Sequence, residues 1–297
     1  MKPAPFEYRR ARSVEEACAA LAENGSDAKL IAGGQSLVPM MAMRLIRPQV
    51  LVDILDIAAL KFVAVEADAV RIGAATRQAD LESHDPLAAA VPVIRQALRW
   101  VGHVQTKNRG TIGGSLAHAD PSAELPLAAA MLDARLSVSR HGGAARELSA
   151  RAFFSGPMST ALEPEECVTE LRWPRWNGAR VGSSFDEVSI RHGDFALVSA
   201  CAQIGLDEAG RCLRAALAIG GAGPVPLDVS AAVQPLVGTR LDEDDVDAAA
   251  QAGVEGLDPP SDLHASADYR RHLARVLARR VLRQAAERAR AAAPGGH

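Results

Sequence analysis

The sequence predicts an α+β protein built from three consecutive parts, residues 1–57, 58–176 and 177–297. The first part has the pattern of a compact β-α-β unit with a glycine-rich turn at a strand end. The second part mixes helical spacing with short alternating strands, and the third begins as an antiparallel sheet and ends in helices. A chain of 297 residues is also long enough for two or three hydrophobic cores.

Caps and apolar runs define the elements of the first part. Ser13 is predicted to be a helix N-cap, and Glu16 completes a capping box. Asn24-Gly25 ends this helix, because glycine accepts the backbone conformation of a helix C-terminus. Strands are predicted over residues 6–8, 29–32 and 49–55. The glycine loop after residue 32 therefore lies at a strand end, where α/β folds place ligands.

In the second part, apolar residues at helical spacing predict one helix over residues 87–101, with Pro92 in its first turns. Another helix is predicted over residues 125–132. Strands are predicted over residues 70–74, 134–139 and 167–173, and Pro174 closes the last of them. The turn at residues 141–143 indicates a hairpin.

The composition changes at residues 174–178, which we interpret as a linker. The third part then has predicted strands over residues 185–188, 197–206 and 213–219 and helices over residues 242–252 and 266–290. The glycines of residues 220–224 are interpreted as a turn rather than as an anion-binding loop.

Charge and hydropathy exclude several classes of function. The net charge of −3 lacks the basic excess of a nucleic-acid-binding protein. No run approaches the ~20 apolar residues of a membrane-spanning helix, and the N-terminus has no apolar core of a signal peptide. We therefore expect a cytoplasmic protein without a transmembrane segment.

The four cysteines are dispersed and include no Cys-x-x-Cys pair: Cys18, Cys167, Cys201 and Cys212. Dispersed cysteines in a reducing compartment are typically small buried side chains. Iron–sulfur clusters need grouped thiolates, and the eight histidines are scattered as well. We expect no metal site in this chain.

Two loops each combine a pair of adjacent glycines with a hydroxyl side chain. They are Ala32-Gly33-Gly34-Gln35-Ser36 and Thr111-Ile112-Gly113-Gly114-Ser115. Glycine lets main-chain N–H groups approach an anion, and two such loops suit two linked phosphates. A single loop of this kind is more often a plain tight turn. Neither matches a Walker A or a Gly-x-Gly-x-x-Gly sequence, so the pair predicts a dinucleotide held in another way.

Longer motifs around both loops resemble a known family. They cover residues 31–45, 104–126, 155–166, 191–196 and 269–277. These segments are similar to the FAD-binding subunit of molybdenum hydroxylases, the family of the carbon monoxide dehydrogenase medium subunit and the xanthine dehydrogenase flavin domain. The resemblance implies a two-subdomain FAD-binding fold followed by a C-terminal domain with a small antiparallel sheet and a helical bundle.

The resemblance also implies which residues bind FAD, without a covalent bond. They are Leu30, Ile31, Ala32, Gly33, Gly34, Gln35, Ser36, Leu37, Thr76, Thr111, Ile112, Gly113, Gly114, Ser115, Asp120, Glu124 and Leu162. Ser115 replaces an asparagine of many members, and Glu124 replaces an aspartate that faces the nucleotide. Asp186-Glu187 stands where many relatives have a lysine.

By the same resemblance, the chain relays electrons through FAD to an external acceptor such as a quinone, a cytochrome, NAD or oxygen. A small partner subunit with two [2Fe–2S] clusters supplies them, and a large subunit with molybdopterin oxidises the substrate. The expected assembly is a dimer of three-subunit units. The alternatives are a stand-alone FAD-dependent oxidase or reductase of the same fold and a flavin-free scaffold.

Two further features have more than one interpretation. His118 is either a catalytic base or a loop histidine that fixes the backbone, and flavin reduction by single-electron transfer requires no base. We therefore predict no catalytic residue in this chain. The arginine-rich helix over residues 266–290 is either solvated or a docking surface for a partner subunit.

Overall fold

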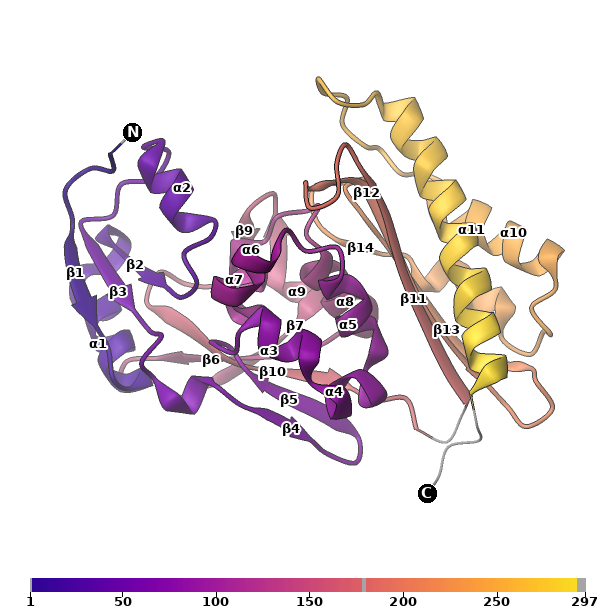
Figure 1. Ribbon diagram of the computed structural model, residues 1–297, viewed down its shortest axis with the longest axis horizontal. Helices are drawn as coiled ribbons and strands as arrows, with labels where there is room; N and C mark the ends of the chain where they lie inside the picture. The colour runs from indigo at the N-terminus through magenta and orange to yellow at the C-terminus, as the bar shows by residue number, and fades with distance from the viewer. Residues whose placement is uncertain (1, 178–179, 293–297) are drawn as a thin grey trace.

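The computed structural model describes residues 2–177 and 180–292, and these residues form three successive larger sheets and one small two-stranded sheet (Figure 1). In the first sheet, β1 (Glu7–Arg10), β3 (Val50–Asp53) and β2 (Ala28–Ile31) run parallel in this order. The helix α1 (Val14–Asn24) joins β1 to β2, and α2 (Leu37–Ala42) follows the first glycine loop. The predicted cap is confirmed, because the Ser13 hydroxyl accepts a hydrogen bond from the Glu16 amide. The predicted capping box is not closed, because the Glu16 carboxylate accepts from the Arg12 amide instead of the Ser13 amide.

The second sheet has the strand order β4-β5-β10-β6-β7 and is antiparallel at every pair. Its strands are β4 (Val63–Val65), β5 (Ala69–Gly73), β10 (Glu166–Pro174), β6 (Arg135–Arg140) and β7 (Arg146–Ser149). The predicted hairpin is β6 and β7. A small separate hairpin is formed by β8 (Phe154–Gly156) and β9 (Ser159–Thr160).

Short helices cover this second sheet. They are α3 (Gln78–Ser83), α4 (Asp85–Ala90), α5 (Pro92–Leu98), α6 (Val104–Arg109), α7 (Ile112–His118), α8 (Glu124–Leu132) and α9 (Ala150–Phe153). Every residue of α8 is buried, so this helix forms the centre of the molecule. Gly25–Asp27, Ala58–Leu60 and Ser230–Leu236 are 3-10 helices.

The prediction of one continuous helix over residues 87–101 is wrong. The chain forms α4 and α5 instead, with Val91 between them in a non-helical conformation. Pro92 explains the break, because a proline lacks the N–H of the helical ladder and disfavours helical backbone in the residue before it. The second glycine pair also differs from the expected loop, since both glycines lie in the first turn of α7.

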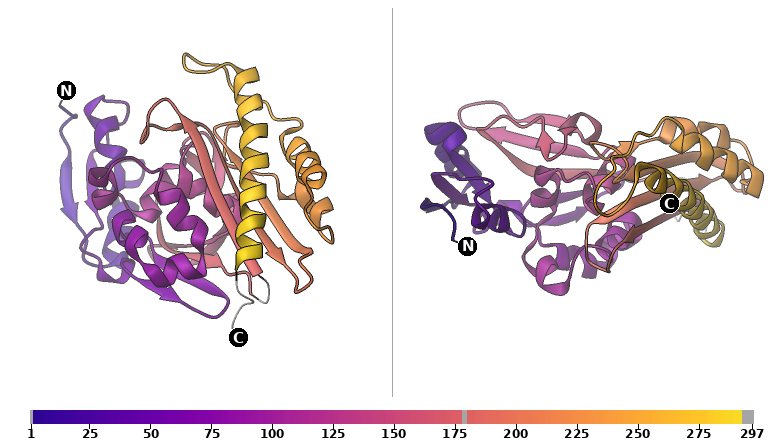
Figure 2. Two further views of the ribbon diagram at one scale, coloured as in Figure 1. Left: turned by 45° about the vertical axis from the view of Figure 1, so that its right-hand side comes forward. Right: turned by 90° about the horizontal axis from the view of Figure 1, so that it is seen from above.

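The third sheet is antiparallel in the order β11-β12-β13-β14, as predicted for this part. Its strands are β11 (Arg180–Ser189), β12 (Ala196–Leu206), β13 (Cys212–Gly220) and β14 (Leu227–Asp228). The helices α10 (Glu243–Val254) and α11 (Ala267–Ala291) lie over one face of this sheet rather than beside it (Figures 1 and 2). The opposite face packs on α5 and α8, and β12 is buried along its whole length.

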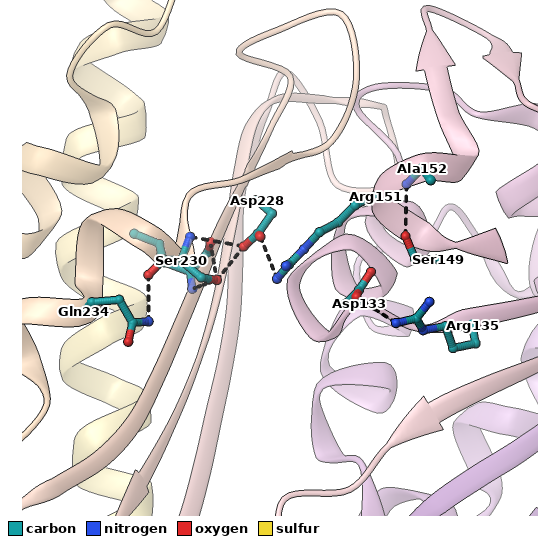
Figure 3. A network of polar contacts seen from close by, with 9 residues as sticks. Asp133, Arg135, Ser149, Arg151, Ala152, Asp228, Ser230 and Gln234 are labelled. Atoms are coloured by element: carbon teal, nitrogen blue, oxygen red, sulfur yellow. Dashed lines mark hydrogen bonds and ion pairs between the residues drawn. The ribbon is translucent and has the colours of Figure 1, made fainter.

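The second and third sheets share one hydrophobic core. Phe185, Cys201 and Ala218 of the third sheet belong to the same buried cluster as Leu98 of α5 and Leu127 of α8. At the rim of this contact, Arg151 of α9 pairs with Asp228 of β14 at 2.6 Å (Figure 3). The predicted linker therefore joins two parts that pack tightly; its residue Gly178 lies outside the described residues.

Most arginines of α11 are engaged within the chain. Arg270 is buried and pairs with Asp262 at 2.6 Å, while its guanidinium also donates to the Leu197 and Gly221 carbonyls. Arg279 and Arg280 pair with Asp247 and Asp186. These contacts attach α11 both to the third sheet and to α10, the other helix that lies on that sheet. Along residues 2–177 and 180–292, no helix is both long and apolar enough to cross a membrane.

Candidate functional site

A cleft of about 750 Å³ lies where the two glycine segments meet. Its walls come from β2 and α2, from α7, from the β8–β9 hairpin and from the loop after β11. Among the described residues of these walls, Lys29 is the only lysine or arginine. An anionic ligand would therefore depend on main-chain N–H groups and hydroxyls for most of its binding.

The first glycine loop supplies such N–H groups. Within residues 2–177 and 180–292, the amides of Gly33, Gly34, Gln35 and Ser36 donate to no protein acceptor. Gly34 has a φ of +71°, a conformation that glycine adopts at no steric cost. The loop thus presents consecutive free donors at a strand end, as the sequence predicts, and such donors are typical of anion-binding concavities.

The second glycine segment is built differently. The Ile112 and Gly113 amides donate to the carbonyls of Thr76 and Ala74, and the Gly114 amide donates to the Thr111 hydroxyl. Its main-chain donors are therefore occupied in this structure. Thr111 and Gly113 line the cleft, and the segment also adds the side chain of Ser115 and the exposed, side-chain-free position Gly114.

The first glycine loop touches the chain just before the second segment, and the second segment packs on the end of β5. A Cβ atom on Gly33 would lie 2.2 Å from the Arg109 carbonyl oxygen, and one on Gly113 would lie 2.6 Å from the Ala74 Cβ. At Gly114, by contrast, a Cβ would meet only the Thr111 hydroxyl closely, at 2.8 Å. Gly33 and Gly113 hence permit close packing, whereas Gly114 leaves open space on the cleft side.

An acidic side chain lies in the wall at the start of α8. Glu124 is 7% exposed, and burial together with the charge of Asp120 raises its pKa to about 7. Asp120 itself accepts a hydrogen bond from the Ser122 amide and does not line the cleft.

Fourteen of the predicted binding residues line the cleft. They are Leu30, Ile31, Ala32, Gly33, Gly34, Gln35, Ser36, Leu37, Thr111, Gly113, Gly114, Ser115, Glu124 and Leu162. Thr76, Ile112 and Asp120 do not line it. The Thr76 hydroxyl bonds both the amide and the carbonyl of Phe62, and Ile112 is fully buried in the core.

Sequence reasoning missed apolar and backbone contributions to the walls. Met158 and Phe195 line the cleft although they are 52% and 60% exposed, and Gly193 and Asp194 accompany Phe195. Residues 191–196 are part of the family resemblance, but no binding role was predicted for them. Large apolar side chains left exposed beside a cleft are typical of a ligand site.

The remaining candidates are placed as follows. His118 lines the cleft at the end of α7. All four cysteines are buried and free, as predicted. Over the same residues, no group of three or more His, Cys, Asp or Glu side chains is arranged to hold a metal ion.

Comparison with known proteins identifies the family. Residues 4–176 match the FAD binding domain in molybdopterin dehydrogenase, and residues 183–285 match the CO dehydrogenase flavoprotein C-terminal domain. The 6-hydroxypseudooxynicotine dehydrogenase complex subunit alpha of Paenarthrobacter nicotinovorans is 40% identical over 98% of this chain and 97% of its own length. The carbon monoxide dehydrogenase medium chain of Afipia carboxidovorans is 35% identical over 98% of this chain and 100% of its own length.

Solved structures agree with this assignment. Quinoline 2-oxidoreductase from Pseudomonas putida 86 superposes with a TM-score of 0.91 and 37% identity, over 97% of this chain and 99% of that one. The superposition covers nearly the whole of both chains, so it includes both matched family domains. The chain therefore belongs to the family of FAD-binding flavoprotein subunits of molybdopterin dehydrogenases.

Proposed function

We propose that this chain binds FAD noncovalently in the cleft and passes electrons from an iron–sulfur partner subunit to an external acceptor. The observation that carries the proposal is the set of amides at residues 33–36 that donate to no acceptor among the described residues, in a loop that lines a cleft of about 750 Å³. Residues 1–57 and 58–176 would form the two FAD-binding subdomains, and residues 177–297 the C-terminal domain.

The residues present fit the cofactor. Charge-assisted hydrogen bonds contribute about 1.5–3 kcal/mol each, so three or four amides suffice for a pyrophosphate without a lysine. Ser115 adds a hydroxyl, and the space at Gly114 admits a phosphate. Thr76, Ile112 and Asp120 would support these residues from behind. When bound, FAD supplies one- and two-electron chemistry, and the protein contributes binding and orientation.

The assembly is the finer part of the proposal. We propose a large subunit with molybdopterin, a small subunit with two [2Fe–2S] clusters, and a dimer of such heterotrimers in the cytoplasm. The relatives in the comparison include named subunits and medium chains of dehydrogenases, which supports an arrangement with separate subunits.

The test is purification of the tagged chain from its native host, followed by mass spectrometry and visible spectroscopy. We expect co-purification of a molybdopterin subunit and an iron–sulfur subunit, together with acid-releasable FAD. The isolated chain should bind FAD and oxidise no small-molecule donor. Donor-dependent oxygen uptake by the isolated chain would instead support a stand-alone oxidase, and a protein that takes up no FAD would support a scaffold.

A further inference from the structure

The turn between β8 and β9 carries a large apolar residue that is left half exposed. Met158 is 52% exposed, and it belongs to none of the three buried clusters that the described residues form. It lines the cleft together with Ser159 and Thr160 of β9. Packing within the chain therefore gives little reason for a large apolar residue at this position.

The backbone of this turn favours a different residue type. Gly156 pairs in register with Ser159, so Pro157 and Met158 form the two-residue connection of the hairpin. The proline ring fixes its φ at about −65°, and Met158 has a φ of +52°. This pair of φ values is the pattern of a type II turn, in which the residue with positive φ is usually glycine or asparagine. Methionine is strained there, because its Cβ lies too close to the following carbonyl oxygen.

A hydrogen bond to α7 holds the strained residue in place. The Met158 amide donates to the Ala119 carbonyl at 3.0 Å, and Ala119 is the residue that ends α7. The hairpin is thereby attached beside this helix (Figure 1). Backbone strain that the surrounding structure maintains is concentrated at ligand sites. At Met158 this strain coincides with an exposed apolar side chain in a cleft wall, which is a second feature of such sites.

The position along α7 indicates which part of a dinucleotide Met158 can reach. The proposed phosphate position is at Gly114 in the first turn of α7, whereas Met158 is bonded to Ala119 at the other end. Ala119 follows Gly114 by five residues, and each residue adds about 1.5 Å along a helix. Met158 therefore lies beyond the pyrophosphate, where a dinucleotide continues into a sugar and an aromatic ring.

We propose that Met158 is a binding residue whose thioether side chain packs against an aromatic ring system of FAD, and that the strained turn holds it there. The inference rests on the proposed function. A thioether makes favourable contacts with aromatic rings, whereas it is only a weak acceptor and offers no donor to a phosphate or a sugar hydroxyl. The isoalloxazine and the adenine of FAD share this chemistry.

The experiment compares Met158→Gly and Met158→Leu in the full chain freed of FAD. Met158→Gly removes the side chain and the strain together, whereas Met158→Leu keeps the strain and an apolar side chain. In a fluorescence titration, the Kd for FAD should rise at least about fivefold in Met158→Gly and stay within about twofold of wild type in Met158→Leu. Without FAD, Met158→Gly should resist urea at least as well as wild type, because glycine accepts the positive φ.

Arg44→Gly is the matched control. Arg44 has a φ of +59°, is exposed and is not among the residues that line the cleft. The substitution makes the same backbone change and should leave the Kd for FAD as in wild type. The visible spectrum at saturating FAD then distinguishes the two rings. A flavin absorption band displaced in Met158→Gly assigns the contact to the isoalloxazine, and an unchanged band assigns it to the adenine.

Equal Kd values for FAD in wild type and Met158→Gly would overturn the inference. A urea midpoint of Met158→Gly clearly below that of Arg44→Gly would overturn it as well, because the side chain would then serve the fold. Failure of the wild-type chain to bind FAD would instead overturn the proposed function itself.

Discussion

Gly33, Gly34 and Gly114 serve three different purposes at the cleft. Gly33 allows two backbone segments to touch, Gly34 adopts a φ of +71°, and Gly114 leaves open space. Glycine is therefore required at these three positions for three different physical reasons. They respond differently to substitution, because a side chain at Gly33 meets backbone and one at Gly114 meets the ligand.

We predict that Gly114→Val weakens FAD binding at least about tenfold while the protein remains folded. The added methyl groups would occupy space that a phosphate needs, whereas the only close protein contact is one hydroxyl. Fluorescence titration with FAD measures the affinity, and circular dichroism checks the fold. Ala144→Val adds bulk in the exposed loop between β6 and β7 and should bind FAD normally. Unchanged affinity in Gly114→Val would show that the phosphates lie elsewhere.

Single residues were predictable from sequence where their chemistry is carried by the backbone. Glycine pairs at strand ends indicate free N–H groups, and Gly33 and Gly34 line the cleft as expected. Thr76 was predicted to contact the ligand, but its hydroxyl accepts a hydrogen bond from the Phe62 amide and donates one to the Phe62 carbonyl. Phe195 was given no role, because sequence does not show whether an apolar side chain is covered or lines a cleft.

At the scale of elements, α11 approaches β11 very closely at Gly182. A Cβ on Gly182 would lie 2.2 Å from the Ala285 carbonyl oxygen and 2.3 Å from the Ala289 amide nitrogen. No rotamer change can relieve a contact between backbones. The missing side chain at this position sets how closely the long helix lies on the sheet.

We therefore predict that Gly182→Ala lowers the free energy of unfolding by about 1–3 kcal/mol or more, as overpacking does. Urea denaturation followed by circular dichroism measures the change. Gly156→Ala is the control, because a Cβ there would meet only the Ser159 Cβ, at 3.8 Å. Equal stability of the two variants would contradict the packing that we describe.

The long elements were predictable, and the short ones were not. The predicted cap at Ser13 and the helix start predicted at residue 266 lie within a residue or two of the observed starts of α1 and α11. The helices α2, α3 and α6 have six residues each, too few to show an apolar period. They form because tertiary packing selects them, and local propensity alone does not decide this.

At the scale of the whole molecule, Glu187 makes stability depend on pH. In the unfolded chain it ionises near pH 4.5, whereas in the folded protein burial raises its pKa to about 8. The stability that the raised pKa of Glu187 contributes to the folded state is fully present below about pH 4.5 and is lost as the pH rises through about 8. We predict that the free energy of unfolding falls between pH 6 and pH 9 by at least about 1 kcal/mol more in wild type than in Glu187→Gln. Urea titrations at both pH values test this, and parallel losses would refute it.

The cofactor should stabilise the whole chain as well. A ligand that binds only the folded state adds about 2.7 kcal/mol at a concentration one hundred times its Kd. We predict that saturating FAD raises the midpoint of thermal unfolding, because the cleft is lined by residues of the first and second sheets and of the loop that joins β11 to β12. Gly114→Val, with its weaker binding, should show a smaller shift at the same concentration. A midpoint that FAD leaves unchanged would argue against binding in the cleft.

The core that the second and third sheets share has a consequence for any attempt to divide the chain. Phe185 and Cys201 lie in one apolar cluster with α5 and α8, although the family match changes between residues 176 and 183. A fragment ending at the match boundary would expose this surface to water and associate or precipitate. A chain cleaved after folding between β10 and β11 should instead remain a noncovalent complex, with its two pieces eluting together until denaturant separates them.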